Sequence, residues 1–342
     1  MARRLSEIAT KVGVSEATVS RVLNGKPGVS ESTRAAVLTA LDVLGYERPT
    51  QLRGERARLV GLVLPELQNP IFPAFAEVVA DALAKRGFTP LLCTRTIGGV
   101  SEAAYVELLL QHQVSGVIFA GGLYAYAEAS QEHYRRLVTR RLPTVLVNAS
   151  VDALTFPHVS CDDAVAVEQA LGHLRDLGHE HIGLVLGSPD HMPSRRKLAA
   201  FAAQHDGEDI ADRVEHTIFS FEGGDAAAAR LMRRGITGLI CASDVLALGA
   251  IRAARRLGLN VPDDVSVIGF DDSALMSSMD PALTTVRQPI GTMGRAAVSL
   301  LVGQIERTSV PAQELLFEPE LIVRASTAPL RDRRHTVAAS SV

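Results

Sequence analysis

Residues 5–24 read LSEIATKVGVSEATVSRVLN, and this stretch predicts two short helices joined by a tight turn. Apolar side chains recur at helical spacing in its first half, at Leu5, Ile8, Ala9 and Val12. Gly13 tolerates the positive φ that often ends a helix, and Ser15 is a good N-cap for the next one. Because Val19 and Val22 then face back toward the first helix, the pattern is typical of a helix-turn-helix of about 20 residues.

The second helix presents a polar face on the side away from its valines. The residues that point outward from its first turns are Glu16, Ala17, Ser20 and Arg21, and such positions reach base edges when a helix enters the major groove. Side chains of the hydrogen-bonding types that can hold a DNA backbone lie nearby, at Ser15, Thr18 and Asn24. A third helix, capped by Ser30 and running to Gly45, completes a three-helix core. A helix pair that only packs is the alternative.

Charge is distributed unevenly along the 342 residues. Residues 1–58 carry ten Lys and Arg against six Asp and Glu, whereas the remainder carries 25 against 32. A basic head on an acidic body fits a nucleic-acid-binding module on a larger globular part, although an ordinary uneven surface would look the same. The hydrophobic content of 47% is enough for two or three cores, so a multidomain protein is expected.

The sequence shows no signal peptide or membrane span, and its cysteines do not suggest a disulfide or a metal site. Charged residues interrupt the amino-terminal stretch, at Arg3, Arg4, Glu7 and Lys11, and no later apolar run approaches the roughly 18 residues that a membrane span requires. We therefore expect a soluble, cytoplasmic protein without a membrane partner. The three separated cysteines lie in or beside apolar runs and are expected to be buried thiols in a reducing compartment, namely Cys93, Cys161 and Cys241.

The string VSEATVSRVLNGKPGVSESTR at residues 14–34, followed by a helix and Gly45-Tyr46, resembles the DNA-binding headpiece of the LacI/GalR family of repressors. Further matches extend the resemblance over residues 4–328. It implies a sequence-specific transcriptional regulator of the repressor type, which binds operator DNA as a homodimer and responds to a small-molecule effector. It also makes the helix after Ser15 the recognition helix, with Glu16, Ala17 and Arg21 at base-reading positions.

The segment ERPTQLRGERAR at residues 47–58 is polar and basic, and its composition predicts a linker. The family resemblance implies a hinge helix here, whose leucine wedges into the minor groove of operator DNA, and Leu52 matches that leucine. The stretch from Tyr46 to Leu52 is about three residues shorter than is usual in the family, so we expect a turn of the hinge helix to be missing. A passive basic tether is therefore the alternative.

From residue 59 onward, short apolar runs alternate with helical patterns, which is the signature of parallel α/β layers. The predicted strands are residues 59–65, 89–93, 116–120, 143–148, 158–162, 182–187, 217–221, 238–242 and 265–270. These are too many for one small sheet, so we expect two doubly wound lobes with a ligand at the strand carboxyl ends. The resemblance implies a periplasmic sugar-binding-protein type of sensor in which the chain crosses between lobes three times.

These patterns predict four regions along the chain. We expect a helix-turn-helix headpiece at 1–46, a hinge or linker at 47–58, a two-lobed effector-binding and dimerisation domain at 59–330, and a disordered tail at 331–342. The fold class is thus an all-α headpiece followed by an α/β sensor.

Local strings in the sensor also resemble family landmarks, among them NPIF, RKLAAF, a long ASDVLALG…VIGFDD stretch and LTTVRQP. The resemblance places an effector site at Ile71, Phe72, Asn148, Lys197, Phe219, Ser243, Asp271 and Gln288. Such a set suits a polyol, because amides and a carboxylate bind hydroxyls while a ring covers an apolar sugar face. Lys197 stands where many relatives have arginine, which makes bidentate recognition of an anion less favourable. ELQNPIFPAFAEV, RRKLAAF and the short hinge resemble actinobacterial regulators that respond to cellobiose or other glucosides.

Enzymatic motifs are missing from the sequence, which contains no P-loop, G-x-S-x-G elbow or H-E-x-x-H motif. The glycine pairs at 98–99, 121–122 and 223–224 predict turns or caps. His179 and His181 lack a third ligand nearby, so neither a metal nor another cofactor is expected. Adjacent carboxylates at 162–163 and 271–272 point in different directions and indicate caps and a single ligand contact. The alternative function, a solute-binding receptor without a DNA role, has no use for the headpiece.

Overall fold

The structure is a computed structural model that describes residues 2–23, 26, 28–43, 58–95, 98–151, 154–205, 207, 209–311 and 313–330. Contacts between Cα atoms divide the chain into two units, one formed by Met1–Leu59 with Gly87–Thr89 and the other by the rest. Within the described residues, no helix combines the length and apolar character that crossing a membrane requires.

The first unit is a bundle of three helices, α1 (Ala2–Val12), α2 (Glu16–Leu23) and α3 (Glu31–Val43). Gly13 has a φ of +74°, and the Ser15 hydroxyl accepts a 3.1 Å hydrogen bond from the Thr18 backbone N–H, so the predicted turn and cap are confirmed. Ser30 caps α3 in the same way. The core consists of Ile8, Ala9, Val19, Val22, Val37 and Ala40. The side chain of Leu5 and residue Gly45 lie outside the described part.

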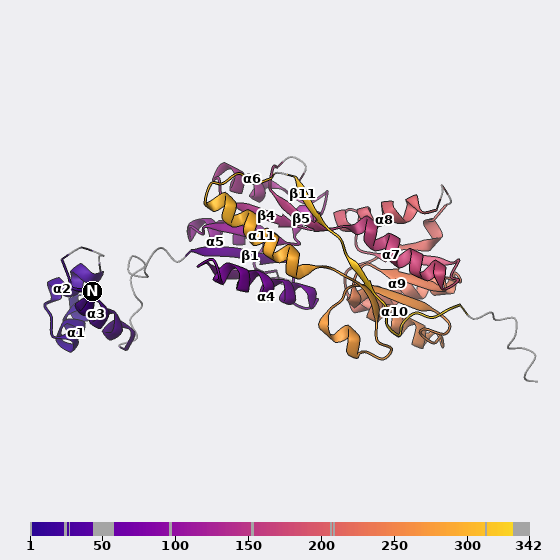
Figure 1. Cartoon of the computed structure of the whole chain (residues 1–342), viewed down its shortest axis with the longest axis horizontal. Helices are drawn as coiled ribbons and strands as arrows, with labels where there is room; N and C mark the ends of the chain where they lie inside the picture. The colour runs from indigo at the N-terminus through magenta and orange to yellow at the C-terminus, as the bar shows by residue number, and fades with distance from the viewer. Residues whose placement is uncertain are drawn as a thin grey trace, which may run out of the picture. The chain divides into compact units, whose positions relative to one another are not determined.

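The second unit contains two six-stranded sheets, each in a lobe of its own (Figure 1). In the first lobe the strand order is β11-β5-β4-β3-β1-β2, with bounds Glu314–Phe317, His158–Cys161, Thr144–Val147, Gly116–Ala120, Leu59–Leu64 and Thr89–Thr94. In the second lobe it is β12-β10-β9-β8-β6-β7, with bounds Glu320–Ile322, Thr284–Arg287, Ser266–Asp271, Gly238–Cys241, Ile182–Leu186 and Val214–His216. All pairs of known register are parallel except β10 with β12.

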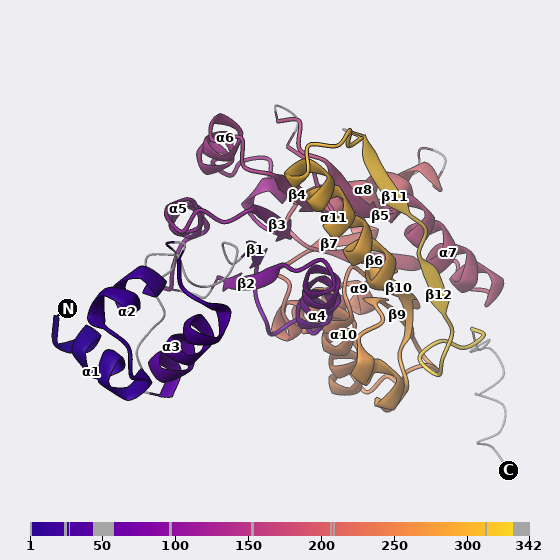
Figure 2. The ribbon, with the colours of Figure 1, turned by 60° about the vertical axis from the view of Figure 1, so that its left-hand side comes forward.

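Helices cover both sheets. Those of the first lobe are α4 (Ile71–Ala84), α5 (Glu102–Gln111), α6 (Glu132–Thr139) and α11 (Ile290–Ile305), and those of the second are α7 (Asp163–Asp176), α8 (Met192–Ala203), α9 (Phe221–Arg233) and α10 (Asp244–Arg256). Short 3-10 turns are η1 (Leu123–Ala125), η2 (Ala211–Arg213) and η3 (Ala274–Ser278). Figure 2 shows α4 and α11 side by side, although 205 residues separate them in sequence.

The chain passes between the lobes three times, as the resemblance implied. It leaves the first lobe after β5, returns between β10 and α11, and leaves again between β11 and β12. The strand carboxyl ends of both sheets therefore meet the crossover segments, and this arrangement forms the walls of a site between the lobes.

Several predicted elements differ from the structure. The apolar run at 217–221 is not a strand, because the Ser220 hydroxyl accepts a bond from the Gly223 N–H and starts α9 at Phe221. The strand of this region is the short, half-buried β7 just before it. The pair Gly223-Gly224 lies inside α9 rather than in a turn, and a Cβ on Gly224 would lie 2.3 Å from the Leu246 carbonyl oxygen of α10. Strands β10, β11 and β12 were not predicted.

Candidate functional site

Helix α2 presents the predicted reading face to solvent. Glu16, Ala17 and Arg21 are exposed, whereas Val19 and Val22 on the opposite side are fully buried in the three-helix core. Ser15 is also exposed, and Thr18 and Ser20 are half-buried. The Ser15 and Thr18 hydroxyls lie 2.9 Å apart and both take part in the cap, so their first role is to start the helix. Asn24 and Leu52 lie outside the described residues.

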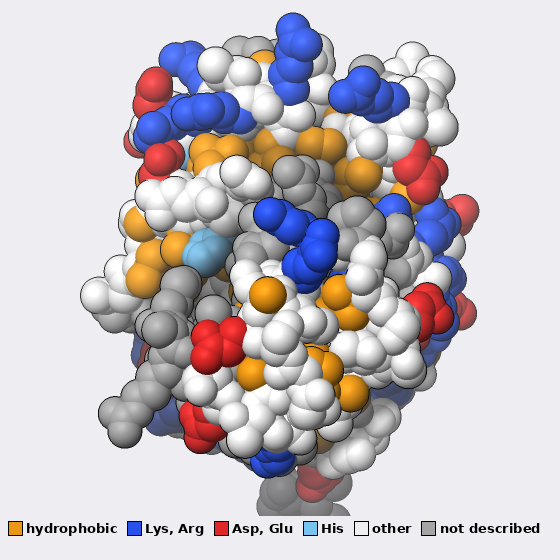
Figure 3. Space-filling model, turned by 90° about the vertical axis from the view of Figure 1, so that its left-hand side faces the viewer, with side chains coloured by type: hydrophobic (Ala, Val, Ile, Leu, Met, Phe, Trp, Pro, Cys, Tyr) orange, Lys and Arg blue, Asp and Glu red, His pale blue; other side chains and the backbone are white. Residues whose placement is uncertain are grey.

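Charge on the visible face is mixed. Figure 3 shows Lys and Arg side chains among acidic and uncharged ones on the face that it draws.

A cavity of about 380 Å³ lies between the two lobes of the second unit. All eight residues predicted for the effector site line it, namely Ile71, Phe72, Asn148, Lys197, Phe219, Ser243, Asp271 and Gln288. The first lobe contributes the start of α4 and the residue after β4, while the second contributes α8, the end of β9 and the residue before α10. Residues that are far apart in the sequence thus meet at one cleft.

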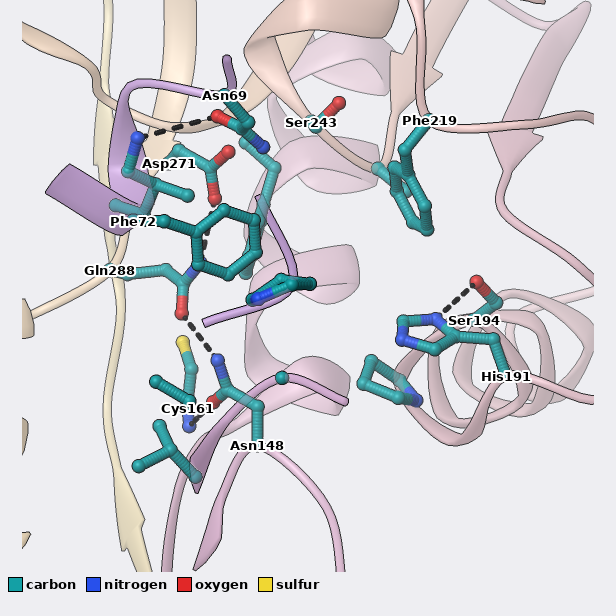
Figure 4. A pocket seen from close by; sticks show the side chains of 18 of the residues that line it. Asn69, Phe72, Asn148, Cys161, His191, Ser194, Phe219, Ser243, Asp271 and Gln288 are labelled. Atoms are coloured by element: carbon teal, nitrogen blue, oxygen red, sulfur yellow. Dashed lines mark hydrogen bonds between the residues drawn. The ribbon is translucent and has the colours of Figure 1, made fainter. Parts of the chain in front are cut away.

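A chain of amide and carboxyl groups joins the lobes at the base of the cleft (Figure 4). Asn148 donates from Nδ2 to Oε1 of Gln288 over 3.1 Å, and Gln288 donates from Nε2 to Oδ1 of Asp271 over 2.6 Å. The Asn148 Oδ1 accepts from the Cys161 backbone N–H at 3.0 Å. Asn148 and Gln288 therefore hold both lobes and the crossover in register, and their hydrogen-bonding groups are largely occupied before any ligand arrives.

Asp271 keeps an acceptor in reserve. Its Oδ2 is buried and has no hydrogen-bond partner among the described residues. Burial, followed by the nearby Asp244 carboxylate, raises the pKa of Asp271 well above its usual value. The residue also has a φ of +120°, which L-residues rarely adopt. A buried acceptor held in an unfavourable backbone geometry is typical of a ligand-binding position, because a ligand hydroxyl can supply the missing bond.

Lys197 lies deep in the cleft, and its ammonium is paired with a buried carboxylate. Its Nζ is hydrogen-bonded to Oδ1 of Asp163, and it sits 3.9 Å from the centroid of the Phe270 ring. Both charged groups are buried, so the pair is nearly neutral as a unit. Burial raises the pKa of the Asp163 carboxyl above its usual value, and the Lys197 ammonium lowers it in part.

Aromatic rings form opposite walls of the cleft. Figure 4 shows Phe72 on one side and Phe219 on the other. Phe219 can take its position only because residue 187 is glycine, since a Cβ there would lie 2.2 Å from the ring. Ser243 uses its oxygen to cap α10 through the Leu246 N–H, which leaves the hydroxyl hydrogen available to the cleft.

The rim is closed on one side by a contact between the lobes. Tyr126 and His191 form an isolated β-bridge, their rings are 4.9 Å apart, and the Ala127 N–H donates to the Asp190 carbonyl over 3.1 Å. Burial, together with the Lys197 charge, lowers the pKa of His191 to about 4. The imidazole is therefore neutral near pH 7, and its Nδ1 lies 3.1 Å from the Ser194 hydroxyl.

The loop that carries this rim is anchored by a buried carboxylate. Glu102 of α5 accepts bonds from the Leu123 N–H and the Tyr134 hydroxyl, and its Oε1 lies 3.0 Å from Nε2 of His133. Gly121, Gly122 and Tyr126, which flank η1, line the cleft. Glu102 thus fixes the position of the segment from Gly121 to Tyr126, although Glu102 itself does not line the cavity.

Sequence reasoning missed several cleft residues. Asn69 lies within the quoted NPIF string and Asp163 within an adjacent carboxylate pair, so both could have been found there. Tyr126 and His191 gave no signal, because their importance comes only from the meeting of two loops. Cys161 also lines the cleft, and burial raises the pKa of its thiol to about 12.

The structure also shows the surroundings of the cysteines, the adjacent carboxylates and His179. The three cysteines are buried free thiols, as predicted. Asp162 caps α7, and Asp272 pairs with Arg287 and Arg324, which confirms that neighbouring carboxylates have separate roles. His179 is buried and hydrogen-bonded to Thr237, Ser266 and the Ala328 carbonyl, so it links its lobe to the segment after β12. The described residues contain no group of three or more His, Cys, Asp and Glu placed to hold a metal.

Comparison with known proteins identifies both parts of the chain. Residues 4–49 match the family of bacterial regulatory proteins, lacI family, and residues 171–327 match the periplasmic binding protein-like domain. The HTH-type transcriptional regulator reg1 of Streptomyces lividans is 51% identical over 336 residues, which cover 96% of this chain and 97% of that protein.

Solved structures agree with these matches. The transcriptional regulator CelR–cellobiose complex superposes with a TM-score of 0.70 at 29% identity, covering 94% of this chain and 99% of that one. The Lac repressor dimer bound to operator and the anti-inducer ONPF gives a TM-score of 0.74 at 26% identity, with 94% and 98% covered. With a relative half identical over nearly its whole length, the chain belongs to the lacI family of bacterial regulatory proteins.

Proposed function

We propose that this regulator is a homodimeric repressor whose affinity for operator DNA is controlled by an uncharged oligosaccharide bound between the two lobes. Arg21, Glu16 and Ala17 read base edges, and the cleft residues bind the sugar. The observation that carries the proposal is that all eight effector residues expected from the sequence surround one cavity. Operator binding also implies that the protein works in the compartment that contains the chromosome, the bacterial cytoplasm.

The charges of the cleft favour a neutral ligand. Lys197 is compensated by Asp163, and His191 is neutral near pH 7 because of its lowered pKa. Arg95 and Glu66, which also line the cavity, carry opposite charges, so the described lining has no excess of cations to bind a phosphate or carboxylate. Polar groups at the base and rings on the walls match the two faces of a sugar, whose hydroxyls and C–H surfaces need different partners.

The volume of the cavity further limits the range of candidate ligands. About 380 Å³ lies within the range of roughly 300 to 1,000 Å³ that small-molecule pockets occupy and leaves space beyond one sugar ring. The CelR structure contains cellobiose, so disaccharides of glucose are the first compounds to test. The cleft is proposed to bind and not to catalyse, since Asp163 is paired with Lys197 and one oxygen of Asp271 is held by Gln288.

The proposal is tested by thermal unfolding of the full chain with cellobiose, maltose and trehalose, with glucose as the smaller control. A disaccharide at 100 times its dissociation constant should stabilise the protein by about 2.7 kcal/mol. The same sugar should alter the affinity for an operator recovered by selection from random duplexes. Asp271→Ala should abolish both effects while operator binding without sugar survives. A sugar that stabilises the wild type and Asp271→Ala equally would exclude this cleft as its site.

The dimer follows from the small reading head of each chain, because one recognition helix touches too few bases for a unique address. Two heads on a near-palindromic site solve this problem, and the related Lac repressor structure is a dimer on operator. Sedimentation of the chain, free and with operator duplex, should show two chains per complex. A monomer in both states would contradict the assignment.

A further inference from the structure

A second cavity, of about 240 Å³, also lies across the two lobes, and it shares no lining residue with the effector cleft. The rim contact separates the two spaces, since Tyr126 and His191 line the cleft whereas Ala127 and Asp190 line the second cavity. Its other walls come from α6 and the segment after β4 in the first lobe, and from the start of α8 in the second.

The second cavity differs from the cleft in charge. Arg135 of the first lobe and Arg195 of the second both line it. The structure gives Arg195 no ion-pair or hydrogen-bond partner for its guanidinium among the described residues, and Arg135 has only a 4.0 Å contact with the exposed Glu132. The one acidic lining residue, Asp190, is already hydrogen-bonded by the Ser188 hydroxyl. The cavity is therefore net cationic.

An unsatisfied polar group lies at the same place. Gln131, which precedes α6, lines the cavity, and its buried Oε1 has no hydrogen-bond partner among the described residues. Its side chain makes no cap for α6, so the local helix does not explain the amide. Val151, Leu154 and Met192 supply apolar surface beside these polar groups. A buried acceptor with no partner favours a ligand that brings a hydroxyl or N–H donor.

We propose that this cavity is a second ligand site, which takes a small hydroxylated anion such as a sugar phosphate or a sugar acid. Arginine forks bind phosphate and carboxylate oxygens, and here one fork comes from each lobe. Gln131 accepts from a ligand hydroxyl, and the apolar wall covers the carbon skeleton. The neutral cleft and the cationic cavity would thus sort two classes of metabolite.

The position of the site also gives it influence over the cleft. A ligand that contacts Arg135 and Arg195 together binds only the arrangement in which the lobes are close, and the effector cleft is formed by the same two lobes. Linkage then requires each ligand to tighten the other by the same factor. This coupling rests on the proposed function of the cleft, whereas the existence of the anion site does not.

Isothermal titration of the full chain in phosphate-free buffer tests the site, with glucose 6-phosphate and gluconate as anionic probes and glucose as the neutral one. One anion should bind per chain. Arg135→Ala and Arg195→Ala should each weaken it at least tenfold, as loss of a charge-assisted hydrogen bond does. Arg140→Ala is the matched control, because Arg140 is exposed at the end of the same helix α6 but does not line the cavity. The two anions distinguish a phosphate from a carboxylate ligand.

Repeating the titrations with Asp271→Ala separates the two sites. The anion should bind this variant as it binds the wild type, while the neutral disaccharide should not. Absence of anion binding, binding unaffected by both arginine substitutions, or loss of binding in Asp271→Ala would each overturn the second site. An anion affinity that stays the same at saturating disaccharide would overturn the bridging of the lobes. Failure of every neutral sugar to bind, with the arginine-dependent anion still bound, would instead contradict only the proposed cleft function.

Discussion

At the scale of single residues, the buried carboxyl of Asp271 destabilises the folded protein and also offers a hydrogen-bonding group to a ligand. Its buried carboxyl has an oxygen without a partner and a pKa raised by burial and by Asp244. Because the folded state holds this proton more tightly than the unfolded state, its stability falls as the pH rises above the usual carboxyl range toward the raised pKa.

Asp271→Asn should therefore raise the free energy of unfolding near pH 8, by an amount on the order of 1 kcal/mol, since the amide carries no charge to desolvate. The gain should shrink near pH 5, because the raised pKa leaves more of the wild-type carboxyl protonated there. Urea unfolding at both pH values measures it. Sugar binding should weaken in parallel, and a variant that is less stable at pH 8 while it binds sugar normally would contradict this account.

Arg21 is the residue that we propose contacts the base edges of the operator. It is exposed on α2 and can fork onto a guanine edge, so Arg21→Ala should lower specific operator affinity by about 1 to 3 kcal/mol. Fluorescence anisotropy with operator and with scrambled duplex measures the ratio of the two affinities. Lys11→Ala, at an exposed basic position on α1, is the control and should leave that ratio unchanged. An unaltered ratio in Arg21→Ala would exclude base reading by this side chain.

The sequence predicted which residues line the cleft better than it predicted the hydrogen bonds and ion pairs that these residues make with one another. Lys197 lines the cleft, as the resemblance implied, but the sequence did not show that it pairs with Asp163, a partner 34 positions away. Asn148 and Gln288 were correctly placed, yet they bind each other across 140 positions. One sequence contains no information on such pairings until the topology brings the strand ends together, so the polar network of a site is the part that escapes prediction.

At the scale of elements, the segment from Gly121 to Tyr126 depends on one buried carboxylate. Glu102→Ala would leave the Leu123 N–H, the Tyr134 hydroxyl and His133 without their acceptor. Buried groups that lose a partner cost about 1 to 3 kcal/mol each, so we expect a clear fall in the free energy of unfolding and weaker sugar binding.

The matched control for this prediction is Glu107→Ala on the same helix. Glu107 pairs with Arg136 at a partly exposed site, where an ion pair contributes about 0 to 1 kcal/mol. Unfolding in urea and sugar titration report the two effects. Equal stability in the two variants would show that Glu102 does not anchor the loop.

Helices and strands were predicted correctly where the hydrophobic pattern was strong, and the predictions failed where that pattern was weak. The buried strands of both sheets are continuous apolar runs, and eight of the nine predicted strands overlap observed ones. The run at 217–221 is equally apolar, but there a capping serine begins a helix and Phe219 faces the cleft. β7 and β12 are edge strands of three residues, too short to leave a pattern.

At the scale of the whole molecule, lobe closure is tied to a proton. His191 has a pKa of about 4 in the closed cleft, whereas an exposed imidazole titrates near 6.5. The closed form therefore binds fewer protons than an open form between these values, and acid favours opening. Sugar affinity should fall as the pH drops from 6.5 toward 4, by at most tenfold per pH unit because one proton is involved.

The pH dependence is isolated by comparing the wild type with His191→Asn, which keeps a polar group at the rim. Asp163 and Asp271 have the opposite pH dependence in both proteins. The pKa of each carboxyl is raised in the buried state, so acid favours the closed form at these two residues. The difference between the two titration curves should therefore show the histidine alone. Parallel curves from pH 7 to pH 5 would mean that closure does not bury this ring.

The three crossings have a consequence for biosynthesis. By the time residue 161 has left the ribosome, five strands of the first lobe exist, yet α11, which packs on them and on α4, is made only after almost all of the second lobe. The sheet of the second lobe is complete only when β12 has been made, and β12 begins three residues after β11, the last strand of the first lobe. Neither lobe is a contiguous piece of chain, so nascent fragments expose apolar surface until the final residues emerge, and the two lobes mature together or not at all.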